Sequence, residues 1–247
     1  MNMNWSVVFD NLDLFAQGLL MTLQLSGIAA LIALIGGLLV ALLRLSHIAI
    51  LRWIAAAFIN VLRSVPPFAL IIYVYYGISL AIGVNFTPFF AGVLALALQY
   101  TAWMAEVYRA GIQAVPPGQI EAAHSLGFNS VRTFISITLP QALRIVIPPL
   151  GNNIVGLIKD SSLVSYIGVM ELIRSAQLLT SQTFRPFEIY TATVILYLVV
   201  TLVISQVFSY LERRHATGRD ALGGRRHTSR RRRARLDRLT ELAVTER

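Results

Sequence analysis

The chain has 247 residues, of which 56% are hydrophobic and 13% are charged, and it contains no cysteine. Soluble domains carry about 25% charged residues, so this chain lacks the polar side chains that would cover its apolar surface in water. The composition excludes a soluble globular protein and predicts a membrane protein. The absence of cysteine excludes disulfides and thiolate metal sites.

The first apolar segment is predicted to be a retained membrane span that follows an external N-terminal segment at 1–17. No basic residue precedes Arg44, whereas a cleavable secretory signal has a positively charged region ahead of its apolar core. A helix needs about 20 apolar residues to cross the hydrocarbon core of a bilayer. Four uncharged runs meet that length: Gly18–Leu43, Val65–Val84, Phe89–Ala105 and Ile189–Leu211.

A fifth apolar run, Ile145–Ile158, is short and contains two prolines followed by Asn152 and Asn153. This composition fits a broken helix that lines water or protein, because freed backbone groups cannot face lipid. It fits equally a continuous, kinked span whose asparagines bond to neighbouring helices. The expected fold class is an all-α polytopic membrane protein with five transmembrane helices, one of them short and broken.

The placement of arginines predicts the orientation of these spans. The segments at 44–52 and 109–144 are rich in arginine, whereas 82–88 carries no charge. Cytoplasmic loops carry an excess of basic residues. We therefore expect the N-terminus outside, both arginine-rich segments inside, and the C-terminus in the cytoplasm.

A segment after the third span carries local signals for a helix, a turn and a second helix. Residues 116–118 are Pro-Pro-Gly and are expected to end the preceding helix, because proline lacks a donor and glycine permits a turn. Gln119–Leu126 is then predicted to be a short helix. Gly127 is expected to take the left-handed conformation at its end.

The second helix of this segment is expected to be capped by Asn129 or Ser130, and Pro140 is expected to begin the next membrane helix. Helical spacing predicts a buried face on it. That face consists of Val131, Phe134, Ile135 and Ile137.

Residues 121–140, EAAHSLGFNSVRTFISITLP, resemble the cytoplasmic EAA motif of permeases of bacterial ATP-binding-cassette (ABC) importers. The pattern E-A-A, then G after three residues, then I-x-L-P after nine more, matches over these twenty residues without a gap. In that family the loop contains a coupling helix that docks onto the ATP-binding subunit. The resemblance implies that the coupling loop spans 112–140, with Glu121, Ala122, Ala123 and Gly127 as its partner-binding element.

Further motifs resemble the polar amino acid branch of that family, and they spread from Gly18 to Arg213. They are GLLMTLQLS, LRSVP, AEVYRAGIQAVPPGQ, GLIKDSSLVSYIGVMEL and TFRPFEIY. Two departures are visible: Ser64-Val65 replaces the usual small-Thr pair, and Pro117 stands where a basic residue is common. The first departure bears on the pathway lining.

The resemblance implies a type-1 ABC transmembrane domain over 18–211 in the inner cell membrane. It also implies four partners: ABC ATPase subunits, a second identical or homologous permease subunit, a periplasmic or lipid-anchored solute-binding protein, and membrane lipid. The substrate would be a polar amino acid. This subunit would hold no cofactor, since ATP and Mg²⁺ would be bound by the ATPase.

Ionisable residues at the ends of the spans are candidates for the substrate pathway, because charges at membrane depth are costly and usually face protein or water. Arg63 is one candidate, although its side chain could instead extend to the interface. Lys159, Asp160 and Ser161 follow the asparagine pair, and Asp160 or Ser161 could cap a new helix whose N-terminus suits a substrate carboxylate. The alternative is a structural Lys159–Asp160 ion pair.

Glu106 and Arg109 lie three residues apart, and the spacing predicts an ion pair on one helix face. The histidines lack metal-ligand spacing.

Other functional classes fit the sequence less well. An ATPase needs the G-x-x-x-x-G-K-[ST] loop, and the single lysine here follows an isoleucine, so the chain is not expected to be an enzyme. A self-contained carrier usually shows two related halves, and none is visible. A permease for another small solute remains an alternative.

The formal net charge of +9 is concentrated at the C-terminal end. Residues 212–247 hold twelve arginines and five acidic residues, which gives +7 for this segment alone. A segment with so little apolar periodicity cannot offset its ordering entropy by burial. We expect a basic disordered cytoplasmic tail over 212–247. The alternative function it suggests is a membrane-anchored protein that binds anionic lipid or nucleic acid.

Overall fold

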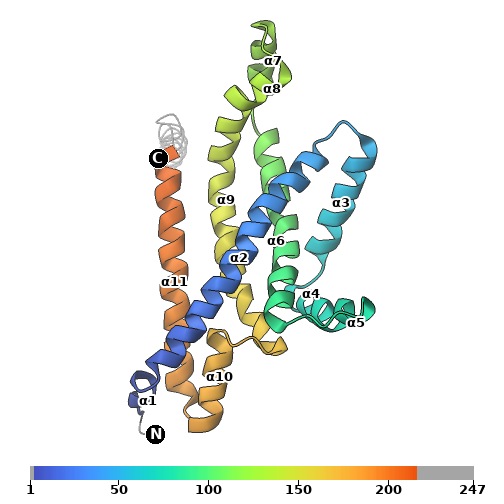
Figure 1. The fold of residues 1–247 in the computed structure, drawn as a ribbon. Helices are drawn as coiled ribbons and strands as arrows, with labels where there is room; N and C mark the ends of the chain where they lie inside the picture. Colours follow the sequence, from blue (N-terminus) through green and yellow to red (C-terminus); the bar gives the residue numbers. More distant parts are fainter. Residues whose placement is uncertain (1–2, 216–247) are drawn as a thin grey trace, which may run out of the picture.

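The computed structural model describes residues 3–215, and within this range every regular element is helical (Figure 1). The elements are α1 (Ser6–Phe9), α2 (Leu12–Arg44), α3 (Ala49–Ser64), α4 (Pro67–Ile72), η1 (Tyr73–Ile78), α5 (Ser79–Ala81), α6 (Pro88–Gln113), α7 (Pro117–Ser125), α8 (Ser130–Thr133), η2 (Phe134–Thr138), α9 (Leu139–Asp160), η3 (Ser161–Ile167), α10 (Leu172–Thr183) and α11 (Pro186–His215). The predicted tail from 216 to 247 lies outside the described residues, and 212–215 continue α11.

Four stretches within the described range are long and apolar enough to cross a membrane. They are α2, α6, the continuous stretch Ser130–Ile167 and α11. α3 and Pro67–Ala81, which are bent by 107° relative to each other, pass the same test only together, and they make a fifth span when they are counted as one broken span. The predicted all-α fold with five spans, one of them broken, is confirmed.

The broken span is the second one and not the fourth. α9 runs without interruption through Pro148 and Pro149, so of the two readings of 145–158 the continuous span holds. The second span begins at Ala49, well before the uncharged run at 65–84. The sequence search missed its first half because Arg52 and Arg63 interrupt the apolar pattern of α3.

The core is centred on the contact between α2 and α6, which cross closely. Small side chains on α2 recur at helical spacing and are buried: Ala29, Ala33, Gly37 and Ala41. A Cβ atom on Gly37 would come within 2.8 Å of the Cβ of Met104 on α6. Small residues thus let the two backbones approach, which is how membrane helices gain packing contacts when lipid offers no hydrophobic driving force.

The two ends of the bundle differ. α7 and α8 project beyond the other helices at the end where α11 finishes, which we call the α7 end (Figure 1). α1 and α10 lie at the opposite end, the α10 end.

The flanks of the bundle are apolar. Only 6% of the most hydrophobic window of α11 is buried, and large apolar side chains are exposed along it. They include Leu198, Val199, Leu202, Val203 and Val207.

Candidate coupling loop and translocation pathway

The short helix α7 ends in a Schellman turn. Gly127 has φ +82°, its backbone N–H donates to His124 O (2.9 Å), and the N–H of Phe128 donates to Ala123 O (3.0 Å). These two bonds satisfy carbonyls that a helix end otherwise leaves without donors. The expected left-handed glycine is confirmed, and it sets the direction in which the chain leaves α7.

The following helix is capped by Asn129, which decides between the two predicted caps. Its side-chain Oδ1 accepts from the backbone N–H of Arg132 at 2.8 Å. The guanidinium of Arg132 lies 4.3 Å from the ring centre of Phe128, a cation–π contact that ties the turn to α8. Pro140 lies in the first turn of α9, but α9 continues η2 directly, so Pro140 does not begin a separate helix.

The four residues of the predicted docking element differ in exposure. Glu121, Ala122 and Gly127 are exposed, whereas Ala123 is buried inside the loop. Gln141 Nε2 donates to Gln119 Oε1 at 2.5 Å and so joins α7 to α9. The loop is therefore a structured projection that rests on the bundle.

The buried apolar face predicted for the second helix is wrong for two of its four members. Val131 is 68% exposed and Ile135 is 57% exposed, while Phe134 and Ile137 are partly buried. Leu126 at the end of α7 is also exposed. Helical spacing indicates an apolar face but not what covers it, and at this tip no other part of the described chain does.

The asparagines, Lys159, Asp160 and Ser161 lie along α9 and at the start of η3. Asp160 is half-buried and accepts a hydrogen bond from the hydroxyl of Tyr100 on α6 at 2.8 Å. Lys159 is exposed, and within residues 3–215 it forms no ion pair with Asp160. The predicted alternative of a structural Lys159–Asp160 pair is therefore wrong.

The expected helix cap at Asp160 or Ser161 is also wrong. η3 continues directly from α9 as 3-10 turns, and neither residue makes a side-chain cap bond to it. Ser161 is fully buried, and its hydroxyl donates to Ile158 O at 2.7 Å. The free helix N-terminus proposed as a carboxylate site is thus absent here. Asn152 is exposed, and Asn153 is partly buried with no partner in the described chain for its Nδ2.

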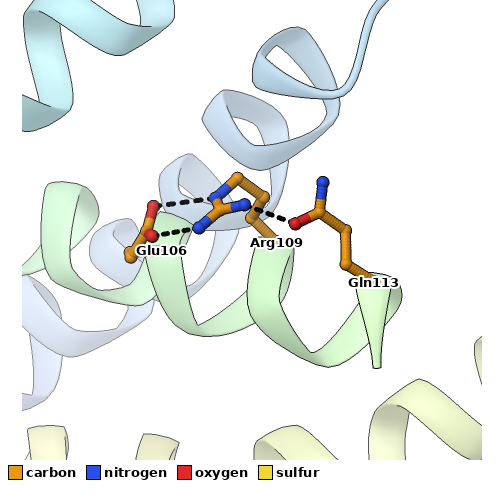
Figure 2. Close-up of polar contacts among 3 residues, drawn as sticks. All are labelled: Glu106, Arg109 and Gln113. Atoms are coloured by element: carbon orange, nitrogen blue, oxygen red, sulfur yellow. Dashed lines mark hydrogen bonds and ion pairs between the residues drawn. The ribbon is translucent and has the colours of Figure 1, made fainter. Parts of the chain in front are cut away.

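Arg63 lies apart from these residues, at the end of α3. It is exposed, and its charge acts on Glu106 of α6, as does that of Arg44. Figure 2 shows that Arg109 pairs with Glu106 through two nitrogens and also contacts Gln113. The predicted Glu106–Arg109 ion pair is confirmed. Arg44, Arg63, Glu106 and Arg109 thus form one charged group on α2, α3 and α6, and Asp160 bonds instead to Tyr100.

A buried hydrogen-bond network at the α10 end was not predicted from the sequence. Glu171 is fully buried, caps α10 through the N–H groups of Ile173 and Arg174, and accepts from the hydroxyl of Tyr197 at 2.9 Å. Thr22 accepts from Leu172 N at 3.2 Å. Burial raises the pKa of the Glu171 carboxyl, against the opposing effect of these hydrogen bonds. This hydrogen-bond network joins α2, α10 and α11.

Glu171 directly precedes α10, and acidic residues near a helix start are a helix signal, although the usual N-cap residues are Ser, Thr, Asp and Asn. Nothing in the local sequence points to Tyr197 as its partner. Among residues 3–215, no group of three His, Asp or Glu side chains could hold a metal ion.

A helical bundle of five candidate spans, with a structured helical loop projecting from one end, defines a multi-pass membrane protein. Residues 20–217 match the family described as binding-protein-dependent transport system inner membrane component. The chain belongs to this family of inner-membrane permeases.

Curated relatives cover nearly the whole described chain. It is 38% identical over 212 residues to the probable glutamine ABC transporter permease protein GlnM of Bacillus subtilis, covering 86% of this chain and 98% of that protein. It is 34% identical to the glutamine transport system permease protein GlnP of Escherichia coli, with 87% and 98% covered. The histidine/lysine/arginine/ornithine permease HisQ of Escherichia coli is 32% identical, with 82% and 93% covered.

The fold matches that of a solved amino acid ABC transporter with histidines. The TM-score is 0.82 at 39% sequence identity, over 87% of this chain and 100% of that one. The inward-facing MetNI methionine ABC transporter shares the fold, with a TM-score of 0.73 at 18% identity.

Proposed function

We propose that this chain forms the translocation pathway of an ATP-driven importer for a polar amino acid and couples it to a separate ATPase subunit. The observation that carries the proposal is the projecting coupling loop, with its Schellman turn at Gly127 and its exposed apolar tip. Relatives named for glutamine and for histidine, lysine, arginine and ornithine support the substrate class.

The coupling loop supplies the contact with the ATPase. Leu126, Val131 and Ile135 form its apolar tip, and exposed apolar side chains outside the membrane indicate a protein partner. Glu121 and Ala122 are accessible beside them. In this proposal the α7 end is cytoplasmic, the N-terminus is outside, and ATP is bound and hydrolysed only by the partner.

The α10 end receives the solute from a binding protein, as the family description implies. Asp160 is held by Tyr100 with its carboxylate half-exposed, and it suits the ammonium group of an amino acid. Lys159 is exposed next to it and suits the carboxylate. Arg63, Asn152 and Asn153 are further candidates along the pathway. Ser161 contributes through its backbone position, because its side chain is buried.

A second permease subunit completes the pathway. Five spans leave long apolar faces on α2 and α11 uncovered within the described chain. Lipid covers part of these faces, and an identical or homologous subunit covers the rest. The proposed assembly is two permease subunits and two ATPase subunits with one binding protein.

The test is uptake in proteoliposomes that contain the permease with its ATPase, supplied with the binding protein and radiolabelled amino acids. We expect accumulation of a polar amino acid only when ATP is present on the ATPase side. Uptake that persists without the ATPase would contradict the proposal. Competition by unlabelled sugars or peptides, but not by amino acids, would favour the alternative of another small solute.

A further inference from the structure

The break in the second span leaves backbone carbonyls without their helical donors. In an unbroken helix Leu62 O would accept from residue 66 and Val65 O from residue 69. Residues 66 and 67 are both proline, and Pro66 has no N–H to donate. α3 ends at Ser64, and the following helical stretch Pro67–Ala81 is bent by 107° relative to α3. At membrane depth such carbonyls need another donor.

Gln99 on α6 supplies that donor. Its side chain is almost fully buried, and its Nε2 donates to Val65 O at 2.7 Å, with a longer contact to Leu62 O at 3.4 Å. The carboxamide has two N–H donors on one nitrogen, which suits two carbonyls from the same helix end. The Oε1 of Gln99 is buried and has no partner within the described chain. The hydrogen bonds that the Gln99 side chain makes are therefore those of its Nε2 with the two carbonyls at the break.

Two contacts connect this break to the candidate substrate residues. Phe68 of α4 packs edge-to-face against Tyr166 of η3, with ring centres 5.1 Å apart, and η3 follows Asp160 directly. On α6, Gln99 is followed by Tyr100, whose hydroxyl donates to Asp160. Adjacent residues of one helix thus hold the bend of the second span and the carboxylate at the end of the fourth.

We infer that Gln99 is a positioning residue of the translocation pathway, which fixes the bend between α3 and α4 and thereby the placement of Arg63 and the α4–η3 contact. This inference rests on the proposed transport function. Gln99 acts through the backbone of the second span and does not itself contact the solute. Its side chain combines the required length with the N–H donors: asparagine is one methylene shorter, and methionine has similar volume but no donor.

The test measures the bend and the transport rate in the same complex. The chain has no cysteine, so Trp53→Cys on α3 and Leu80→Cys on α5, both at strongly exposed positions, can carry spin labels. Double electron–electron resonance on the permease–ATPase complex in lipid nanodiscs then reports the distance across the break. Gln99→Met is compared with Thr101→Val, a buried polar residue of the same helix whose side chain lies against Gly36 of α2.

We expect Gln99→Met to shift or broaden the distance distribution and to lower kcat for uptake at least tenfold, or about 1.4 kcal/mol. The KM for the loaded binding protein should change less than twofold, and Thr101→Val should leave the distances unchanged. Unchanged distances in Gln99→Met, or shifted distances with a normal kcat, overturn the inference.

If Gln99→Met does not assemble, Gln99→Asn tests the same point, because it keeps an amide but withdraws it from the carbonyls. A Gln99→Asn distance distribution identical to wild type overturns the inference. Failure of the proposed function is distinguishable, since it appears as absent ATP-dependent amino acid uptake in the wild-type complex, whatever the distances show.

Discussion

Replacing Gly127 by valine tests the coupling loop at the point where its geometry depends most on one residue. Gly127 has φ +82°, a conformation that L-residues with a side chain adopt only at a cost. A Cβ atom there would meet nothing within 4 Å, so the penalty is conformational and not a clash. It amounts to about 1–3 kcal/mol for a β-branched residue.

The chain offers a matched control in Gly118. A Cβ atom on Gly118 also meets nothing within 4 Å, but its φ is that of ordinary helix in α7. Valine is no worse than glycine inside a helix. Gly118→Val therefore adds the same side chain to the same loop without the backbone penalty.

A penalty of one or two kcal/mol reduces the population of the native turn by about 5- to 30-fold relative to its alternatives. We expect Gly127→Val permease to insert in the membrane but to bind the ATPase weakly in a pull-down, with ATP hydrolysis no longer coupled to uptake in proteoliposomes. Gly118→Val should couple as wild type does. Normal coupling in Gly127→Val would refute the docking role of this turn.

Three further predictions follow from the same structure. Lys159→Ala and Asp160→Ala should each lower amino acid uptake while basal ATP hydrolysis stays measurable; wild-type uptake by both variants in well-expressed complexes would remove these residues from the pathway. Tyr197→Phe deletes the hydroxyl that donates to the buried Glu171 carboxylate at the start of α10. It should lower the free energy of unfolding by about 1–3 kcal/mol with little effect on ATPase binding. An unchanged melting temperature in nanodiscs would contradict this prediction. Truncation after Thr217 should leave insertion and uptake intact, because the removed basic segment is expected to act only through anionic lipid, and loss of the ATPase from a pull-down would make the segment a second docking element.

The coupling loop was predictable in detail because its structure is local. The turn at Gly127 and the cap at Asn129 arise from residues within a few positions of each other, and their backbone requirements are specific to residue type. Local signals do not decide burial, which is why the predicted burial of Val131 and Ile135 was wrong. Periodicity identifies an apolar face, but whether that face is covered depends on elements elsewhere, and no described part of this chain covers it here.

The membrane spans were likewise predicted only in part. Length and hydrophobicity were enough to predict five crossings, because the bilayer imposes both on any helix that spans it. They did not locate the break, since proline pairs occur in both the second and the fourth spans. In the second span the carbonyls at the break have a donor on another helix, because Gln99 of α6 donates to Val65 O and contacts Leu62 O. No local pattern around the proline pair records this partner.

Sequence alone determined the membrane environment, the number of spans and the local form of the coupling loop, because each follows from composition or from neighbours in the chain. Only the tertiary structure decided that Asp160 bonds to Tyr100 and not to Lys159, and that Glu171 meets Tyr197. These partners are 60 and 26 residues apart. The orientation of a buried polar group is set by whichever donor the packing of the helices brings within about 3 Å, and no local pattern records that choice.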